Sequence, residues 1–241
     1  MKTVICIPTY NEAENLSKLV SALLIAVPSL HILVIDDNSP DGTGKMADDL
    51  GVQHPGQIFC LHRAGKLGLG TAYIQGWKWA LENGYEAIGQ MDADFSHPVD
   101  KVAVLQEKLI SGGGDAVIGS RYVNGGGLDE RWPAWRKALS AFGNFYARTI
   151  LGLPMRDCTG GFRLWNARVL RSMPLDRIRS NGYVFQVETA YVAVRQGFRF
   201  IETPIYFADR RWGTSKMNIK IQLEAAIRCW QLRGMYRDLK S

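Results

Sequence analysis

Two aspartates separated by one residue carry the most specific chemistry in this sequence of 241 residues. Asp92 and Asp94 lie in the run Gln90-Met-Asp-Ala-Asp-Phe-Ser-His-Pro98, directly after an apolar, strand-like stretch at 86–91. Because alternate residues of an extended chain point the same way, both carboxylates can face one side. Their mutual repulsion is relieved by a hard divalent cation. The spacing predicts a Mg²⁺ or Mn²⁺ site at Asp92 and Asp94 that would bridge a bound diphosphate and neutralise a leaving group.

Two further polar motifs also follow strand-like runs. Pro8-Thr-Tyr-Asn-Glu12 comes after the first run, and Asp36-Asp-Asn-Ser-Pro-Asp-Gly-Thr43 comes after the second. Open parallel sheets bind ligands at the carboxyl ends of their strands, so both motifs are candidates for a ligand site. Asp37 is the better candidate for binding ribose hydroxyls, and Asp41 for capping the next helix. A plain strand-to-helix turn is the alternative for each motif.

The elements that position these motifs alternate between strand and helix. Apolar β-rich runs lie at 3–7, 31–35, 57–61, 86–91 and 115–119, and helical patterns lie at 71–82, 99–110, 133–151 and 184–196. Two more helices are expected to start near Asn11 and near Asp41, the first through a capping box variant formed by Asn11 and Glu14. This alternation predicts an α/β fold, with a Rossmann-like, mostly parallel central sheet flanked by helices. The length suits a single domain over 1–241.

The net charge limits the classes of binding partner, and the cysteine spacing indicates the cellular compartment. The net charge of +6 and pI near 9.2 favour polyanions, which include nucleotides, phospholipid surfaces and nucleic acid. The four cysteines lack a Cys-x-x-Cys spacing, so we expect reduced thiols of a cytoplasmic protein rather than a zinc site. We find neither a signal-peptide pattern nor an apolar run long enough to cross a bilayer, and therefore expect no secretion and no membrane span.

The motifs, taken together and in order, resemble glycosyltransferase family 2, and more narrowly its dolichol-phosphate mannose synthase group. The runs that carry the resemblance are Val4–Glu12, Val34–Thr43, Met91–Pro98, Gly119–Tyr122, Asp157–Trp165, Gly182–Glu188 and Arg210–Lys216. The resemblance implies a GT-A fold with a nucleotide-sugar half at 3–120, an acceptor half at 121–216 and a C-terminal amphipathic helix at 217–241. It also implies inverting transfer of mannose from GDP-mannose to a polyprenyl or dolichyl monophosphate.

Site residues carry over from the resemblance position by position. Base and ribose would be held by Pro8, Tyr10, Glu12, Ile35 and Asp37. Metal and diphosphate would be held by Asp92, Ala93 and Asp94. The donor and acceptor phosphate site would be completed by Arg121, Arg210 and Lys216. The resemblance thus makes Asp92, Asp94 and Arg121 the predicted catalytic set.

The acceptor decides whether a general base is needed. A hydroxyl acceptor needs one, and Gln186-Val187-Glu188 is where it would be sought, although Glu188 suits a structural or metal-linked role equally well. A phosphate monoester has a second pKa near about 6 and arrives ionised. Arginine suits phosphate oxygens, so Arg121, Arg136 and Lys137 are predicted to bind the lipid phosphate, with Arg163 in reserve. The alternative for Arg136 and Lys137 is that they bind no ligand and simply lie on a solvated helix face.

Aromatic and basic residues interleave at 131–150 and again in the C-terminal stretch, which suits a bilayer interface. We therefore expect a peripheral protein at the cytoplasmic face of a membrane, with an integral membrane subunit as a further possible partner. The alternative for the C-terminal stretch is an amphipathic helix that packs on the core.

The nearest competing function is transfer of another donor sugar, such as glucose from UDP-glucose, followed by a non-catalytic nucleotide-binding module. Nucleic-acid binding leaves the acidic motifs unexplained, and dinucleotide binding lacks its Gly-x-Gly-x-x-Gly turn. The loop Gly65–Gly70 is expected on the donor side.

Overall fold

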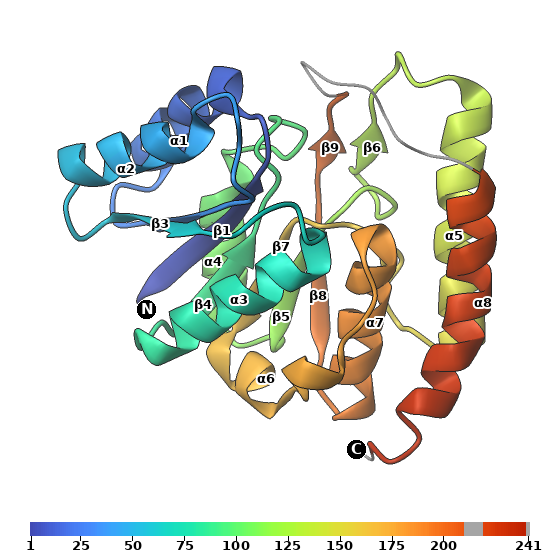
Figure 1. The fold of residues 1–241 in the computed structure, drawn as a ribbon. Helices are drawn as coiled ribbons and strands as arrows, with labels where there is room; N and C mark the ends of the chain where they lie inside the picture. The colour runs from blue at the N-terminus through green and yellow to red at the C-terminus, as the bar shows by residue number, and fades with distance from the viewer. Residues whose placement is uncertain (210–218, 240–241) are drawn as a thin grey trace.

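A computed structural model describes residues 1–209 and 219–239, without the side chains of 219–225. Seven of the described strands form one sheet in the order β3-β2-β1-β4-β7-β5-β8 (Figure 1). Their bounds are Thr3–Thr9 (β1), His31–Asp36 (β2), Ile58–His62 (β3), Ala87–Gln90 (β4), Ala116–Ser120 (β5), Arg163–Asn166 (β7) and Phe200–Pro204 (β8). All neighbours pair in parallel except β7, which is antiparallel to β4 and β5. The predicted mostly parallel sheet is confirmed.

Helices cover both faces of this sheet because successive strand residues point to opposite sides. Val4 and Cys6 of β1 contribute to the core under α3 (Leu69–Glu82), α6 (Ala167–Ser172) and α7 (Gly182–Arg195). Ile5 and Ile7 contribute to the opposite core under α1 (Ala13–Ala26), α2 (Thr43–Gln53) and α4 (Lys101–Ile110). A strand buried on both faces reads as a continuous apolar run, which is why β1 was recognisable in the sequence.

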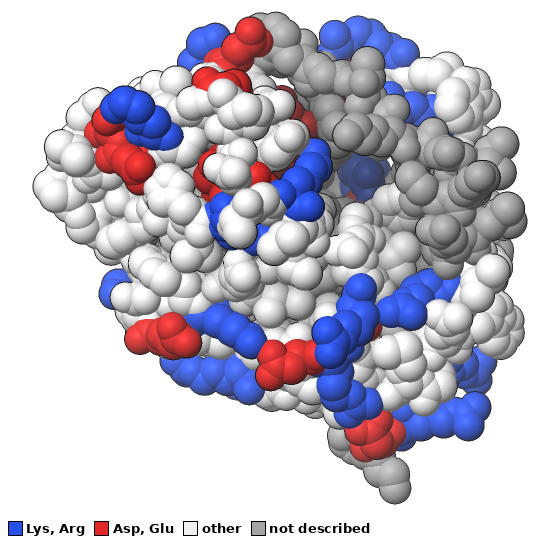
Figure 2. Space-filling model, in the orientation of Figure 1, with Lys and Arg blue, Asp and Glu red and all other residues white. Residues whose placement is uncertain are grey.

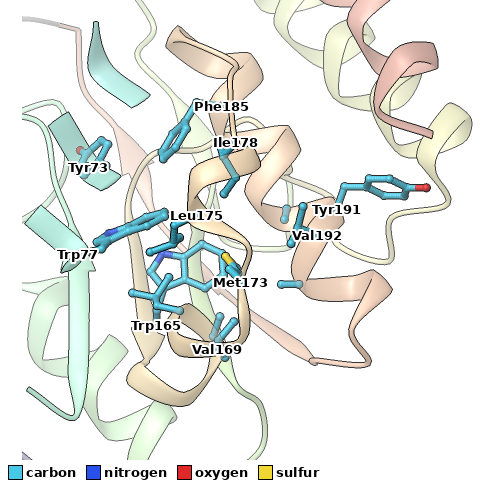
Figure 3. Packing of buried hydrophobic residues seen from close by; sticks show 14 of the residues in the cluster. Tyr73, Trp77, Trp165, Val169, Met173, Leu175, Ile178, Phe185, Tyr191 and Val192 are labelled. Carbon is cyan, nitrogen blue, oxygen red and sulfur yellow. The ribbon is translucent and has the colours of Figure 1, made fainter. Parts of the chain in front are cut away.

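Large aromatic side chains bind α7 to the sheet. Trp77 of α3 lies edge-on to Trp165 of β7, with ring centroids 5.9 Å apart, and packs against Phe185 of α7 at 5.4 Å (Figure 3). Tyr73 stacks on the same Phe185 at 5.9 Å. Each pair adds about 0.5–1.5 kcal/mol beyond the burial of its area. This cluster therefore fixes the position of α7, the helix that carries Gln186 and Glu188.

A second layer lies to one side of the sheet. The helices α5 (Ala134–Leu151) and α8 (Ile219–Met235) run side by side there (Figure 1), where Trp230 Nε1 donates to Tyr146 Oη at 3.0 Å. Two short strands, β6 (Gly127–Leu128) and β9 (Tyr206–Phe207), pair in parallel, and a 3₁₀ turn spans Leu175–Arg177. In the part of the chain that is described, no helix is long and apolar enough to cross a membrane.

The start of α1 differs from the predicted capping box of Asn11 and Glu14. The helix begins at Ala13, and the backbone N–H groups before its first turn donate to side chains of the loop between β2 and α2. Ala13 N donates to Asp41 Oδ2 at 3.1 Å, while Thr43 N donates to Asp41 Oδ1 at 3.0 Å. One carboxylate thus satisfies the starts of α1 and α2. The capping box was wrong because the cap comes from about 30 residues along the chain, not from the local sequence.

Candidate active site

The loops that follow β1, β2 and β4 share an unusual backbone feature. Among the described residues, the non-glycine positions with positive φ are Asn11 at 60°, Asn38 at 57° and Phe95 at 60°, one in each of these loops. Such conformations are strained for side chains other than glycine and cluster at functional sites. The carboxyl edge of the parallel strands, where the sequence places its polar motifs, is therefore also where the backbone is strained.

The residues predicted to hold the base and ribose, and Ala93, predicted to hold the diphosphate, differ in their exposure. Tyr10 is 37% exposed, and Lys66 Nζ lies 4.0 Å above its ring, which brings the loop Gly65–Gly70 to this side. Ile35 is fully buried and Ala93 is 4% exposed, so neither side chain is open to a ligand. The remaining members are Pro8, Glu12 and Asp37.

Asp37 already has a partner. Arg63 forms a buried ion pair with its carboxylate and donates to Thr71 Oγ1 at 2.5 Å. Burial raises the pKa of Asp37, although the charge of Arg63 opposes that shift. Its neighbour Asp36 accepts from Thr9 Oγ1 at 3.0 Å and from Ser39 Oγ at 2.6 Å. Of the two, Asp36 is a structural link between loops, and ribose binding by Asp37 stays a prediction.

The predicted metal site lies in the loop after β4. Ser96 N donates to Asp94 Oδ1 at 3.0 Å, and Asp92 N donates to His97 Nδ1 at 3.1 Å. Because His97 Nδ1 accepts this bond, its proton is on Nε2, which lies 4.0 Å from Asp92 Oδ2. Burial lowers the pKa of His97, while the charges of Asp92 and Asp94 raise it, so the ring is neutral at pH 7. Both carboxylates therefore lie close to one buried imidazole.

The polar atoms of this loop fit a hard divalent cation. Ser96 is buried, and its Oγ has no hydrogen-bond partner among the described residues. A buried hydroxyl without a partner is costly, and an oxygen-ligated cation at the neighbouring carboxylates would satisfy it. The side chain of Asp92 is 33% exposed, which leaves a route for a ligand. The oxygen groups that could serve such a cation are the carboxylates of Asp92 and Asp94 and the hydroxyl of Ser96.

A tight turn at 157–161 packs against this loop. A methyl group added at Gly161 would lie 3.5 Å from Gln186 Nε2, 3.7 Å from His97 Cε1 and 4.0 Å from Asp92 Oδ1. Two side chains of the loop after β4 and one side chain of α7 therefore converge on Gly161. A side chain at this position would fill the space beside Asp92, in van der Waals contact with these three groups.

Two arginines hold that turn, each in a different way. Arg121 donates from Nε and Nη2 to the two oxygens of the fully buried Asp157, both at 2.7 Å, and from Nη2 to Thr159 Oγ1 at 2.8 Å. Arg163 is fully buried and donates to the backbone carbonyls of Cys158 and Gly160 at 2.8 and 2.9 Å. Burial lowers the pKa of Arg163 to about 10. Holding Arg163 in reserve for the lipid phosphate was wrong, because its guanidinium faces the protein interior.

The acidic candidate Glu188 is also buried. Its Oε2 accepts from Ser180 N at 2.8 Å, and its Oε1 accepts from Tyr236 Oη at 2.7 Å. Of the roles left open for Glu188, this geometry favours the structural one. Gln186, which accepts from Gln90 Nε2 at 3.4 Å, is the residue of this segment that faces Asp92.

One aromatic ring connects the residues predicted to bind the acceptor phosphate with the loop after β4. Phe207 of β9 lies 5.6 Å from the His97 ring, 5.9 Å from the Trp132 ring and 5.3 Å from the guanidinium carbon of Arg121. Arg136 stacks on Trp132 at 3.6 Å. Phe207 thus contacts the loop after β4, Arg121 and the residues just before α5, and brings them together in one site.

Arg136 and Lys137 also have protein partners. Arg136 Nη1 lies 3.5 Å from Asp209 Oδ1, and Lys137 Nζ donates to the carbonyl of Glu130 at 3.4 Å. Arg210 and Lys216 lie outside the described residues. The sequence analysis did not assign Ser96, Asp157 or Phe207 to this site, and in the segment 186–188 it selected Glu188 rather than Gln186. Asp157 and Gln186 lie within runs that carry the family resemblance, whereas Phe207 gave no signal because only the fold brings it to Arg121 and His97.

Comparison with known proteins agrees with this geometry. The model of the family described as glycosyl transferase family 2 matches residues 4–173. The polyprenol monophosphomannose synthase of Mycolicibacterium smegmatis is 42% identical over 97% of this chain and 88% of its own length. The undecaprenyl-phosphate mannosyltransferase of Micrococcus luteus is 43% identical over 100% of this chain and 98% of its own length.

Solved structures show the same fold at much lower identity. Glucosyl-3-phosphoglycerate synthase from Mycobacterium tuberculosis, in complex with Mn²⁺, UDP and its product, matches with a TM-score of 0.64 and 15% identity over 97% of this chain and 79% of that one. A mannosyltransferase from Pyrobaculum calidifontis, in complex with GDP-Man and Mn²⁺, matches with a TM-score of 0.60 and 14% identity over 100% of this chain and 76% of that one. The expected GT-A architecture is confirmed.

Proposed function

We infer the reaction from one premise: this chain belongs to glycosyl transferase family 2. We propose that it transfers a mannosyl group from GDP-mannose to a polyprenyl or dolichyl monophosphate, with inversion at the anomeric carbon. The names of two relatives that match almost the whole chain support the sugar and the acceptor. The observation that carries the proposal is the convergence of Asp92, His97 and Gln186 on Gly161, beside a ring that also contacts Arg121.

Asp92 and Asp94, with Ser96 Oγ, would hold Mg²⁺ or Mn²⁺ against the diphosphate of the donor. When bound, the cation would supply positive charge that stabilises the departing diphosphate. His97 orients this loop, because its Nδ1 accepts from Asp92 N and its ring stacks on Phe162 at 5.2 Å. The donor nucleoside would lie over the loops after β1 and β2, beside Tyr10 and Asp37.

The described side chains around Asp92 suit an acceptor that needs no general base. Gln186 faces Asp92 but cannot accept a proton in the reaction, and Glu188 is committed to Ser180 and Tyr236. A phosphate monoester, ionised above about pH 6, can attack without a base. Arg121 and Arg136, which Asp157 and Asp209 orient, would bind its oxygens together with Lys137.

The face of α5 and α8 suits a membrane surface. Trp135, Phe142 and Phe145 of α5 are 60–65% exposed, and Trp230 of the neighbouring α8 is 54% exposed. Arg148 lines a groove of about 350 Å³ beside Phe145, and Lys and Arg side chains gather toward the C-terminal end of α8 (Figure 2). Exposed aromatic groups flanked by positive charge bind the interface of anionic bilayers. We propose that this face docks at the cytoplasmic side of a membrane, alone or beside an integral membrane subunit.

The test is a transfer assay with purified protein, Mg²⁺ or Mn²⁺, and a short polyprenyl phosphate. GDP-mannose and UDP-glucose are offered separately, and the glycolipid is identified by mass spectrometry. Mannosyl-phosphoryl-polyprenol is the expected product, and the matching polyprenol, which lacks the phosphate, should give none. Glucose transfer in preference to mannose would replace the donor assignment, and transfer to the alcohol would overturn the acceptor assignment.

A further inference from the structure

A mixed cluster of metal-binding side chains lies on the far edge of the sheet from the acceptor half. Cys60 and His62 belong to β3, and Asp48 belongs to α2, which packs on it. β3 is the edge strand, separated from β4 and the Asp92 loop by β2 and β1. At about 4.8 Å between neighbouring strands, β3 and β4 are about 14 Å apart. This cluster is therefore separate from the proposed metal site at Asp92 and Asp94.

The three side chains converge closely. His62 Nε2 lies 2.9 Å from Asp48 Oδ1, and His62 Nδ1 lies 4.0 Å from Cys60 Sγ. One ligand atom from each residue lies within 4.8 Å of the other two. Zinc binds sulfur at about 2.3 Å and nitrogen or oxygen at about 2.0–2.2 Å, which places tetrahedral ligand atoms about 3.3–3.6 Å apart. Because an ion binds one ring nitrogen of His62, that nitrogen must approach both Asp48 and Cys60, which takes shifts of up to about 1.5 Å.

Local structure explains why these side chains meet. Cys60 and His62 are two residues apart on a strand, so they point to the same face, which α2 covers. Asp48 and Cys60 line a groove of about 550 Å³, and the side chains of His62 and Asp48 are about half exposed, at 52% and 54%. The cluster is thus held by two packed elements and remains open to solvent.

We propose that Asp48, Cys60 and His62 form a second metal site, for a thiophilic divalent cation of the Zn²⁺ class, with water as the fourth ligand. A thiolate and an imidazole select Zn²⁺ or Co²⁺ over Mg²⁺, which prefers oxygen ligands. The spacing rules that argued against zinc in the sequence look for paired cysteines. They do not detect a Cys-x-His strand completed by a helix carboxylate.

The site would join α2 to the edge of the donor half. A methyl group added at Gly44 would lie 2.8 Å from Asp36 Oδ2 and 3.2 Å from His62 Cε1. Asp36 in turn accepts from Thr9 and Ser39. A bound ion would therefore fix the corner where α2 meets the loops proposed to hold the nucleoside, and we expect it to raise the melting temperature without entering the reaction.

Binding replaces a proton with the metal. Burial, with the charges of Asp48 and Asp36, raises the pKa of Cys60 to about 12, so the sulfur carries a proton until a cation displaces it. One S–H bond breaks, one metal–sulfur bond forms, and one proton enters the solvent.

The test is a Co²⁺ titration of the full chain under reducing conditions, with excess Mg²⁺ to occupy the oxygen-ligand site. A near-ultraviolet sulfur-to-cobalt absorption band is expected, and Zn²⁺ should abolish it by displacing Co²⁺. Cys60→Ser should remove the band. Asp48→Asn should weaken Zn²⁺ binding, measured against a chromophoric chelator, by about 10- to 100-fold.

Matched controls separate this site from other acidic groups. Asp49→Asn changes the neighbouring exposed carboxylate on α2, which pairs with Lys45, and should leave affinity unchanged. Asp94→Asn should leave the cobalt band unchanged while it abolishes transferase activity, so the failure of one site is distinguishable from failure of the other. Absence of the band at millimolar Co²⁺, or equal effects of Asp48→Asn and Asp49→Asn, would overturn the proposal.

Discussion

The loops at the strand ends hold their polar side chains in hydrogen bonds, whereas the layer of α5 and α8 leaves large apolar side chains exposed. In the loops after β1 and β2, Asp36 and Asp41 accept hydrogen bonds from groups of neighbouring segments. In the layer of α5 and α8, Phe142 and Phe145 have no covering element within the described chain and are 60–65% exposed. A site for a small, charged ligand requires groups that are already oriented, whereas a surface for a bilayer requires only apolar area and charge. The two regions can therefore be tested separately.

The largest effect should come from the loop after β4. Asp94→Ala should lower kcat by at least about 1000-fold, because it removes one of the two carboxylates proposed to hold the cation at the departing diphosphate. Vesicle binding should not change. The check is transfer to a short-chain acceptor at saturating Mg²⁺ and Mn²⁺. Asp100→Ala, at an exposed position before α4, is the control; near-normal turnover of Asp94→Ala would refute the metal site.

The second effect concerns the junction between the two regions. Asp157→Asn leaves the buried guanidinium of Arg121 without its charged partner, and should lower the free energy of unfolding by about 3–5 kcal/mol in urea at pH 7. Burial alone would raise the pKa of Asp157, but Arg121 holds it below its ordinary value of 3.8.

The pH dependence of that pair has a definite sign. Because the unfolded chain binds this proton more readily, the stability is present above pH 3.8 and is lost as the pH falls through the folded pKa. The difference between wild type and Asp157→Asn should therefore shrink below about pH 3.8. A difference that stays constant there would show that the carboxylate charge is not the cause.

The third effect belongs to the outer layer. Phe142→Ser and Phe145→Ser should each weaken binding to anionic vesicles by about tenfold, since each removes an apolar side chain that would leave water. Turnover of a short, water-soluble acceptor should stay within about twofold. Ile25→Ser, at an 82% exposed position on α1, is the control for loss of apolar surface elsewhere. Equal loss of vesicle binding in all three variants would remove the assigned membrane face.

The smallest effect should come from an exposed ion pair on α2. Lys45 and Asp49, at 3.0 Å and four residues apart, are largely solvated. Lys45→Ala should change the free energy of unfolding by only about 0.3–0.5 kcal/mol, and transferase activity should not change. Thermal unfolding of this variant beside Asp157→Asn measures how much burial adds to one ion pair.

The strands β1 to β5 and most helices could be predicted because each follows from a local sequence pattern, whereas β8 was not predicted. A strand buried on both faces is a run of apolar residues, and its helix has an apolar stripe. β7 was missed because it contains Arg163, which is charged yet buried and is satisfied by the carbonyls of a turn that precedes it. No local pattern reports such partners.

The candidate site also contains residues that a local pattern predicts and residues that only tertiary packing brings there. Asp92 and Asp94 could be predicted from a strand end and their spacing, since neither depends on distant contacts. Gln186 and Phe207 reach that loop from α7 and β9, nearly 100 residues or more along the chain, so only packing brings them there. The pairing of Asp37 with Arg63 was hidden for the same reason.

The contact between Glu188 and Tyr236 gives the end of the chain a role in the interior. Tyr236 lies just beyond α8, yet its hydroxyl donates to a carboxylate of α7, while Arg177 Nη2 donates to the Met235 carbonyl at 2.6 Å. Proteolytic trimming before Tyr236 would remove the hydroxyl that donates to the buried Glu188, two residues from Gln186. The residues that follow α8 therefore help to hold α7 in place, and removing them would disturb the helix that packs beside the loop after β4.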